Sequence, residues 1–226
     1  MGLLDEAVLM TYDKEDSEDH LAACLAEADF IYHLAGMNRP QREEEFALIN
    51  AGITQRIVDL LTRARRNPSI VFASSTQALL DNPYGKSKKA AEDILIDLRQ
   101  RCDNHLYIFR LPGVFGRWSR PNYNTVVATF CHNIAHDLDI SISDPNREME
   151  LVYIDDVIRC FIDLLSADIN YSGNMLYEID RSFKVTLGEM AQKIYGFRQA
   201  ERQGTVPELP DLFSECLYNT YQSFIS

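Results

Sequence analysis

The chain has 226 residues, of which 34 are acidic and 22 basic, giving a formal net charge of −12. This surplus of negative charge disfavours nucleic acid and anionic membranes as partners. The sequence contains no apolar run of about eighteen residues and no signal-like start, and its five cysteines form no Cys-x-x-Cys pair. We therefore expect a cytoplasmic protein with reduced thiols.

The first half of the chain alternates between short apolar segments and longer amphipathic ones. Residues 29–35, 70–75 and 106–111 are rich in β-branched and aromatic side chains and are predicted strands. Residues 43–66 carry apolar side chains on one helical face, and a second helix begins at Pro83. Near-continuous apolar strands between helices predict a doubly wound α/β domain, with a parallel sheet covered on both faces.

Two helices are predicted nearer the carboxyl end. One covers residues 157–165 and begins after Asp155 and Asp156, where acids suit the positive end of the helix dipole. The other begins near residue 209 and is amphipathic; we expect it to pack on its own domain, with docking onto another partner as the alternative. The predicted organisation is a main domain over residues 1–165, with substrate-lobe insertions near 117–150, then a lobe completion over 166–208 and a tail over 209–226.

Tyr84 and Lys88 lie four residues apart in the helix that begins at Pro83, so their side chains share one face. Ser75 ends the strand just upstream, with Thr76 as the alternative hydroxyl. The ammonium favours the phenolate and lowers the pKa of the tyrosine, and the hydroxyl can steady the reacting oxygen. Such a set moves a proton on and off a sugar or alcohol oxygen while a nicotinamide moves a hydride. We predict that Ser75, Tyr84 and Lys88 are catalytic.

Further segments over residues 29–165 resemble an extended short-chain dehydrogenase/reductase of the NAD-dependent epimerase/dehydratase type. They are H-L-A-G at 33–36, N-A-G-I-T at 50–54, Ser74-Ser75, N-P-Y-G-K-S-K at 82–88, R-L-P-G-V-F-G at 110–116 and V-Y-I-D-D-V at 152–157. The resemblance implies a Rossmann-like, NAD(P)-binding sheet with a small carboxyl-terminal α/β substrate lobe. It also implies a homodimer formed through the helices at 43–66 and after Pro83.

A narrower resemblance is to the capsular-polysaccharide reductases. The matching segments are H-L-A-G-M-N-R-P at 33–40, S-S-T-Q-A at 74–78, D-N-P-Y at 81–84 and W-S-R-P-N-Y-N at 118–124. These enzymes reduce a UDP-linked 4-keto-6-deoxy-N-acetyl sugar on the route to UDP-N-acetyl-L-fucosamine. The resemblance implies a UDP-N-acetyl sugar substrate and an NADP or NAD cofactor, with NADPH favoured.

The resemblance also implies binding residues. Those for the cofactor are Asp13, His33, Leu34, Ala35, Gly36, Tyr84, Lys88, Arg110 and Pro112. Those for the substrate are Asn38, Arg39, Thr76, Asn122, Tyr123, Asn124 and Arg147. The family often places a diphosphate-binding arginine where this chain has Met149, so Arg147 is the nearby substitute.

Both ends depart from the family pattern. The family begins with a strand and a glycine-rich turn that holds the cofactor pyrophosphate, whereas this chain has no glycine between Gly2 and Gly36. Residues 8–13 resemble the second strand of the family, which brings Asp13 near the position of a ribose-binding acid. We expect the first strand, turn and helix to be missing, with a divergent amino terminus as the alternative. No cupin sequence follows, so we expect this chain to be a fragment of a reductase. Because the glycine-rich turn is missing, we expect the fragment to be inactive or weakly active.

Three other readings stay open. A nucleotide-sugar 4-epimerase is one; a 4,6-dehydratase is another, although Gln77-Ala78 stand where dehydratases carry Asp-Glu. A domain that binds nucleotide sugar or a protein without turnover is the third. His132 and His136 have the spacing of a metal pair, but no third ligand is evident, so we predict a surface or packing role and no metal site.

Overall fold

The computed structural model describes residues 7–102, 104–165 and 175–225. It divides the chain into two compact units, one of residues 1–111 and 161–178 and the other of residues 112–160 and 179–226. This division differs from the boundaries at 165 and 208 that the sequence suggested. The reason is strand pairing, since strands before residue 160 share a sheet with a strand after residue 179.

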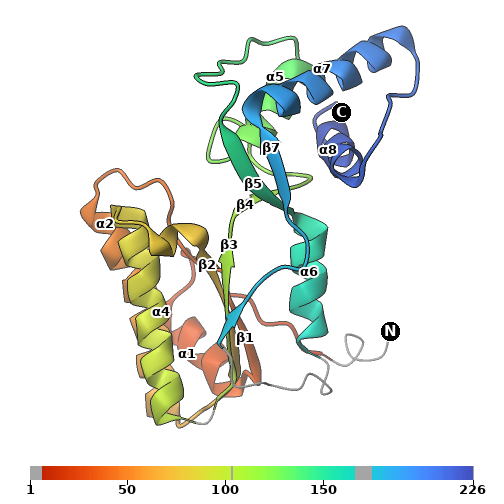
Figure 1. Cartoon of the computed structure of the whole chain (residues 1–226). Helices are drawn as coiled ribbons and strands as arrows, with labels where there is room; N and C mark the ends of the chain where they lie inside the picture. The colour runs from red at the N-terminus through yellow and green to blue at the C-terminus, as the bar shows by residue number, and fades with distance from the viewer. Residues whose placement is uncertain (1–6, 103, 166–174, 226) are drawn as a thin grey trace. The chain divides into compact units, whose positions relative to one another are not determined.

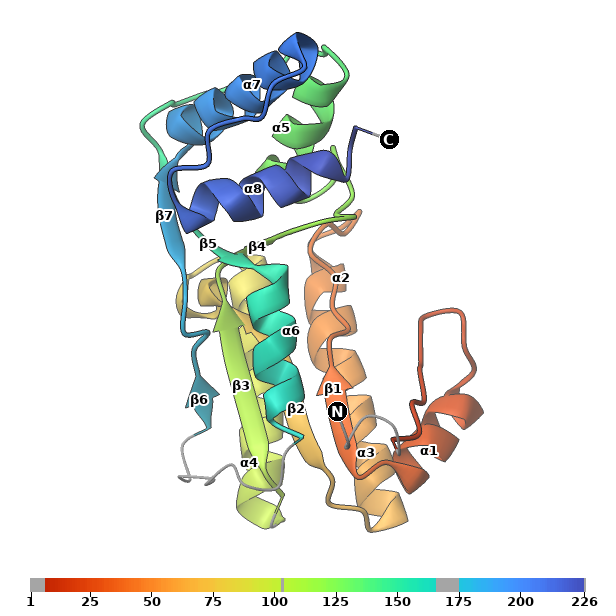
Figure 2. The same ribbon diagram turned by 90° about the vertical axis from the view of Figure 1, so that its right-hand side faces the viewer.

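The first unit, which Figure 1 shows with its sheet edge-on, contains a four-stranded sheet in the order β1-β2-β3-β6 that can be followed in Figure 2. Its strands are β1 (Phe30–His33), β2 (Ser69–Ser75), β3 (Leu106–Leu111) and β6 (Leu176–Tyr177). All pairings are parallel, with Phe30 opposite Ser69, Ile70 opposite Leu106 and Ile108 opposite Leu176. The predicted parallel sheet is therefore confirmed, although β1 is shorter than the predicted segment 29–35.

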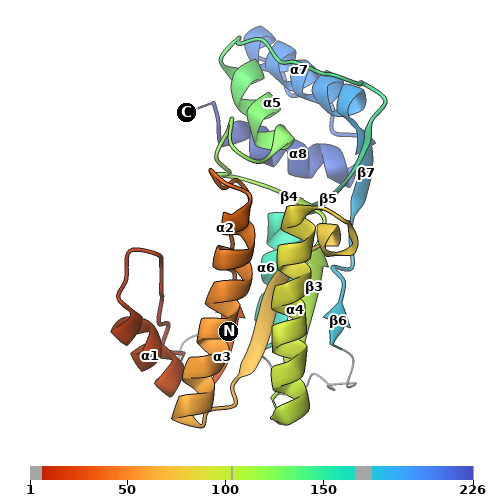
Figure 3. The ribbon, with the colours of Figure 1, turned by 90° about the vertical axis from the view of Figure 1, so that its left-hand side faces the viewer.

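Helices α3 and α4 cover one face of this sheet (Figure 3). The helical elements of this part are α1 (Glu18–Glu27), α2 (Glu44–Phe46), the π-helical turn η1 (Ala47–Ala51), α3 (Gly52–Ala64), the 3₁₀ turn η2 (Thr76–Leu79) and α4 (Pro83–Arg101). Ile57 and Leu61 of α3, Leu95 of α4, and Ile70 and Phe72 of β2 belong to one buried apolar cluster. The apolar helix faces predicted from the sequence thus pack into the core of the first unit.

The opposite face of the sheet meets the carboxyl-terminal part of α6 (Ile154–Asp163). The Phe161 ring lies 5.0 Å from that of Phe109 and 6.0 Å from that of Tyr32. The Tyr32 hydroxyl donates a 2.7 Å hydrogen bond to the Phe161 carbonyl, and burial raises the pKa of Tyr32 to about 12. Both faces of the sheet are therefore covered, as the sequence predicted.

The prediction of a strand over residues 8–13 is wrong. The structure has no strand there, and Val8 and Leu9 are each 85% exposed. A strand needs a neighbour for its backbone hydrogen bonds, and among the described residues β1 pairs with β2 alone. Asp13 instead begins an exposed turn in which its amide donates to the Asp16 carboxylate at 2.7 Å.

The second unit is built on a three-stranded sheet in the order β4-β5-β7 (Figure 2). Its strands are β4 (Gly113–Phe115), β5 (Glu148–Tyr153) and β7 (Phe183–Thr186), with β5 parallel to β4 and antiparallel to β7. Its helices are α5 (Val126–Ala135), α7 (Leu187–Gln203) and α8 (Leu212–Gln222). Thr186 and Glu189 form a capping box at the start of α7, which fixes where β7 ends and the helix begins.

Helix α8 packs into the core of its own unit. Phe213, Cys216, Leu217 and Tyr221 are buried in one apolar cluster with side chains of the β4-β5-β7 sheet, α5 and α7. This is the arrangement predicted for the amphipathic tail.

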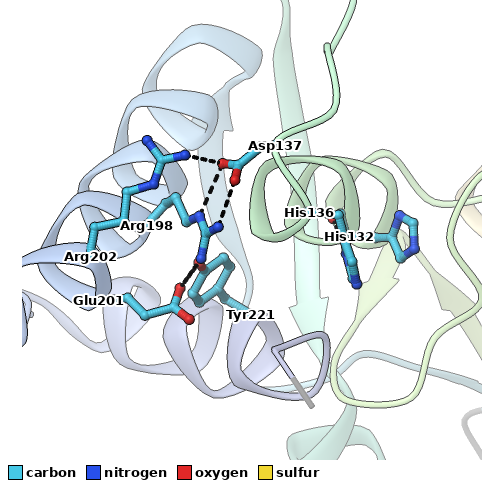
Figure 4. Close-up of polar contacts among 7 residues, drawn as sticks. All are labelled: His132, His136, Asp137, Arg198, Glu201, Arg202 and Tyr221. Carbon is cyan, nitrogen blue, oxygen red and sulfur yellow. Dashed lines mark hydrogen bonds and ion pairs between the residues drawn. The ribbon is translucent and has the colours of Figure 1, made fainter.

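A polar network joins α7 and α8 to the end of α5 (Figure 4). Asp137 accepts hydrogen bonds from Arg198 at 2.7 and 3.1 Å and from Arg202 at 2.5 Å. Glu201 accepts from Arg198 at 2.9 Å and from the Tyr221 hydroxyl at 2.7 Å. The two guanidinium groups hold the pKa of Asp137 well below its usual range.

The rings of His132 and His136 contact one another at a tilt (Figure 4). Their ring centroids lie 4.4 Å apart, and His136 Nδ1 lies 2.8 Å from the backbone oxygen of His132. The predicted packing role fits this contact. In the described part of the chain, no three His, Cys, Asp or Glu side chains gather as metal ligands.

Candidate active site

The start of α4 explains how Tyr84 reaches Ser75. Asn82 caps the helix by accepting a 2.8 Å hydrogen bond from the Gly85 amide, and Pro83 occupies the first helical position. A Cβ on Gly85 would stand 2.1 Å from the carbonyl oxygen of Gln77 in η2. Only glycine allows so close an approach. The first turn of α4 therefore packs directly against η2. Tyr84, in this turn, follows Ser75 at the end of β2 by nine residues.

The Ser75 hydroxyl lies close enough to the Tyr84 phenol to lower its pKa as a hydrogen-bond partner. Ser75 ends β2, and its hydroxyl also accepts a 3.2 Å hydrogen bond from the Gln77 amide. The Phe46 ring lies 5.6 Å from the Tyr84 ring. Burial raises the pKa of Tyr84, and the hydrogen bond with Ser75 opposes that rise. The prediction that Lys88 lowers this pKa is not met: the pKa is raised, and burial is the cause with the largest effect.

Lys88 is buried beside the end of β2. Its Nζ donates a 2.9 Å hydrogen bond to the Ala73 carbonyl and lies 4.9 Å from the centroid of the Phe72 ring. Burial lowers the pKa of Lys88 to about 8, and the charge of Glu92 opposes that shift. The fold thus brings Ser75, Tyr84 and Lys88 together where β2 ends and α4 begins.

Asn50 is a buried residue of this region to which the sequence reasoning gave no role. Its side-chain oxygen accepts from the Met37 amide at 2.6 Å, and its Nδ2 donates to the Met37 carbonyl at 3.0 Å and to Ser87 Oγ at 2.8 Å. The amide therefore fastens the loop after β1 to the turn of α4 between Tyr84 and Lys88. The sequence did contain a signal for Asn50, because it is a polar residue on the apolar face of the helix predicted over residues 43–66.

His33 is held in the core through Thr54. His33 Nε2 lies 2.8 Å from Thr54 Oγ1, which itself donates to the Asn50 carbonyl at 2.9 Å. Because the threonine proton goes to Asn50, His33 Nε2 carries the proton and donates. Burial, with a smaller contribution from the charge of Lys88, lowers the pKa of His33 to about 3, so the imidazole is neutral.

Four residues expected to bind the cofactor, at positions 33–36, differ in their solvent exposure. The His33 side chain is buried, whereas Leu34, Ala35 and Gly36 are exposed at the carboxyl end of β1. Ligands of parallel α/β sheets bind at such strand ends. The exposed backbone of residues 34–36 is accessible to a ligand, whereas the His33 imidazole faces the core.

The other residues expected at the cofactor lie in different surroundings. Arg110 donates to both carboxylate oxygens of Glu92, at 2.9 and 2.6 Å, so its guanidinium is engaged inside the fold. Asp13 lies in the exposed turn described above, and Pro112 is half-buried in the second unit.

The residues expected at the substrate are divided between the two units. Asn38, Arg39 and Thr76 belong to the first unit, where Arg39 and Thr76 are exposed and Asn38 is half-buried. The second unit holds the others, which are Asn122, Tyr123, Asn124 and Arg147, all exposed.

The loop that carries three of these residues has its own internal contacts. Asn122 has a left-handed backbone with φ of 54°, and its amide donates to Thr129 Oγ1 at 3.0 Å. The guanidinium of Arg120 lies 5.0 Å from the centroid of the Tyr123 ring. These contacts give the loop a defined shape.

Comparison with known proteins shows which family the chain belongs to. Residues 5–175 match the NAD dependent epimerase/dehydratase family. The chain belongs to that family. It is 39% identical over 217 residues to the UDP-2-acetamido-2,6-beta-L-arabino-hexul-4-ose reductase of Pseudomonas aeruginosa, covering 96% of this chain and 58% of the relative. The chain therefore spans little more than half the length of this curated relative.

Solved structures agree with the fold. The capsular polysaccharide assembling protein CapF from Staphylococcus aureus matches with a TM-score of 0.80 and 40% identity, over 94% of this chain and 57% of that one. RMD from Pseudomonas aeruginosa, solved in complex with NADPH, matches with a TM-score of 0.77 over 97% of this chain and 91% of that one. Its identity is 18%, so this second likeness concerns the fold alone. In the described part of this chain, no helix is long and apolar enough to cross a bilayer.

Proposed function

We propose that this chain carries the proton-transfer site of an NAD(P)H-dependent reductase that acts on the 4-keto group of a UDP-linked 4-keto-6-deoxy-N-acetylhexose. The observation that supports it most is that the Ser75 hydroxyl lies close to the Tyr84 phenol, with Lys88 one helical turn further along. The 39% identical relative, named as a reductase of a UDP-linked hexul-4-ose, supports this substrate class. The likeness to CapF supports a role in capsular or surface polysaccharide synthesis.

The proposed chemistry assigns one task to each side chain. A nicotinamide cofactor would supply the hydride. Tyr84 gives its proton to the C4 oxygen of the sugar, and its raised pKa keeps it protonated and ready to donate at neutral pH. The Ser75 hydroxyl steadies the same oxygen, and the Lys88 ammonium stabilises the phenolate that the proton transfer leaves behind.

The residues present fit a nicotinamide cofactor at the carboxyl end of the sheet. An ammonium group has three donors, and Lys88 gives one of them to Ala73. A Cβ on Gly36 would stand 3.0 Å from Lys88 Nζ, so the strand-end backbone lies next to the ammonium. Lys88 would hold the ribose hydroxyls of the cofactor, with NADPH favoured over NADH.

The other proposals concern the surroundings of the reaction. We propose a cytoplasmic homodimer with a UDP-N-acetyl sugar as its ligand. Asn38, Arg39, Asn122, Asn124 and Arg147 are exposed or half-buried polar side chains of the two units and offer donors to sugar and phosphate oxygens.

The test is an incubation of the chain with saturating NADPH and the 4-keto UDP-sugar, with products identified by NMR. We expect NADPH consumption and a new C4 hydroxyl, and Lys88→Met should abolish both. Interconversion of UDP-sugar C4 epimers without net NADPH consumption would favour the 4-epimerase. Loss of water from a 4-hydroxy UDP-sugar would favour the dehydratase. UDP-sugar binding with no conversion at any cofactor concentration would favour a binding domain.

A further inference from the structure

Glu92 is a fully buried acid that the proposed reaction does not use. It lies on α4 four residues after Lys88 and eight after Tyr84, so the three side chains share one face of the helix. Its side chain is 0% exposed. A buried carboxylate is costly unless it is paired and hydrogen-bonded.

The partners of Glu92 come from two neighbouring strands. Ser74 Oγ on β2 donates to Glu92 Oε1 at 2.6 Å. Arg110 on β3 donates through Nε to Oε1 at 2.9 Å and through Nη2 to Oε2 at 2.6 Å. Ser74 and Arg110 are opposite one another in the sheet register. The carboxylate therefore connects α4 to the ends of both strands. Its partner on β2, Ser74, is the residue directly before Ser75.

Glu92 also supplies negative charge beside Lys88. Burial lowers the pKa of Lys88 to about 8, and the charge of Glu92 counters that effect. Glu92 is the charged group that acts on the pKa of Lys88, while the nearby His33 is neutral and Arg110 is hydrogen-bonded to Glu92. Without the carboxylate, the buried ammonium would lose the charge that opposes its desolvation.

We propose that Glu92 is a positioning residue for the reaction, which acts by keeping Lys88 charged and by holding α4 against the strand end that carries Ser75. The carboxylate does so from behind the site, without touching the reacting atoms. Arg110 and Ser74 hold the carboxylate in place through their hydrogen bonds to it. The role of Arg110 is thus to support Glu92 rather than to grip the cofactor.

This inference rests on the proposed function, so its test is independent of turnover. Lysine side-chain NMR signals of the labelled full chain are followed against pH, and the Lys88 signal is assigned by its loss in Lys88→Arg. We expect Glu92→Gln, which keeps the shape and loses the charge, to lower the pKa of Lys88 by about 1 unit. Glu92→Asp keeps the charge and should leave that pKa much nearer its original value. Asp97→Asn is the matched control: it removes an exposed carboxylate from the same helix and should leave the Lys88 signal unmoved.

A second variant guards against simple disruption of the fold. Arg110→Gln removes the cation that competes for the carboxylate but keeps a donor facing it, so the pKa of Lys88 should rise, opposite to the effect of Glu92→Gln. Damage to packing alone would move both variants in the same direction. If Glu92→Gln does not fold, Arg110→Gln carries the test. An unchanged or lowered pKa in Arg110→Gln, or an unchanged one in Glu92→Gln, overturns the proposal whether or not the chain reduces a sugar.

Discussion

Gly36 lies directly against Lys88: a Cβ on Gly36 would stand 3.0 Å from Lys88 Nζ and 3.2 Å from Asn50 Oδ1. The end of a lysine side chain yields to such a contact, so Gly36→Ala should change the free energy of unfolding by less than about 1 kcal/mol. It should nevertheless displace the ammonium and reduce the rate of sugar reduction by about tenfold or more. Steady-state kinetics and urea unfolding of the same samples measure both effects.

Gly52→Ala provides the matched control for Gly36→Ala. A Cβ on Gly52 would meet no atom within 4 Å, and Gly52 begins α3. Alanine is the better helix former, so this variant should gain up to about 0.5–1 kcal/mol of stability and keep its activity. An equal loss of activity in both variants would show that the contact with Lys88 is not the cause.

Gly85 is expected to be irreplaceable for stability. In Gly85→Ala the new Cβ would meet backbone oxygens of Gln77 and Leu80 at 2.1 and 2.7 Å, and backbone cannot rotate away as a side chain can. We expect a loss of at least about 2 kcal/mol in urea unfolding, because η2 and α4 must separate. Gly196→Ala in α7, where a Cβ meets nothing within 4 Å, should be neutral or stabilising. Similar stability of the two variants would contradict the close approach of η2 and α4.

His33 should make the fold sensitive to acid. Its pKa is lowered from 6.5 to about 3 in the folded chain, so between these values the unfolded chain binds a proton that the folded chain does not. Stability from this group is fully present above about pH 6.5 and is lost as pH falls toward 3, by about 2 kcal/mol at pH 5. His33→Gln keeps a donor for Thr54 and should flatten this part of the stability curve. A curve of unchanged slope in the variant would assign the acid sensitivity to other groups.

Helix α8 should contribute to the stability of the second unit. Leu217 is 0% exposed within the core, and Leu217→Ala should cost about 2–5 kcal/mol through loss of buried contacts. Leu212→Ala changes the same side chain on the same helix at a position 41% exposed, and should cost much less. Unfolding by urea, followed by near-ultraviolet circular dichroism, compares them. Equal costs would mean that α8 is not packed as described.

The sequence predicted the elements whose patterns are long and regular. The helix from Pro83 and the strand ending at Ser75 appear as expected, because their apolar periodicity and capping residues agree. The hydroxyl, phenol and ammonium of the site could be read from their spacing. Their pKa values could not, because burial outweighs the nearby charge only once the packing is known.

The failures share a physical origin in contacts between distant segments. Residues 8–13 look like a strand, but a strand also requires a neighbour, which no local pattern reveals. Asn50 lies in the π-helical turn η1 and is hydrogen-bonded to Met37 and Ser87, which are distant from it in sequence. Glu92 resembles an ordinary helix-surface acid in sequence, although its four-residue spacing from Lys88 was a usable signal of the shared buried face.

The central claim is that Tyr84 provides the proton for reduction of the 4-keto sugar, and single-turnover reduction at saturating NADPH tests it most directly. Tyr84→Phe keeps the ring against Phe46 and removes only the hydroxyl that lies near Ser75. We predict slow reduction by the unaltered chain and a rate at least about 100-fold lower in Tyr84→Phe, with UDP-sugar affinity unchanged. Equal rates in the two proteins would contradict the account.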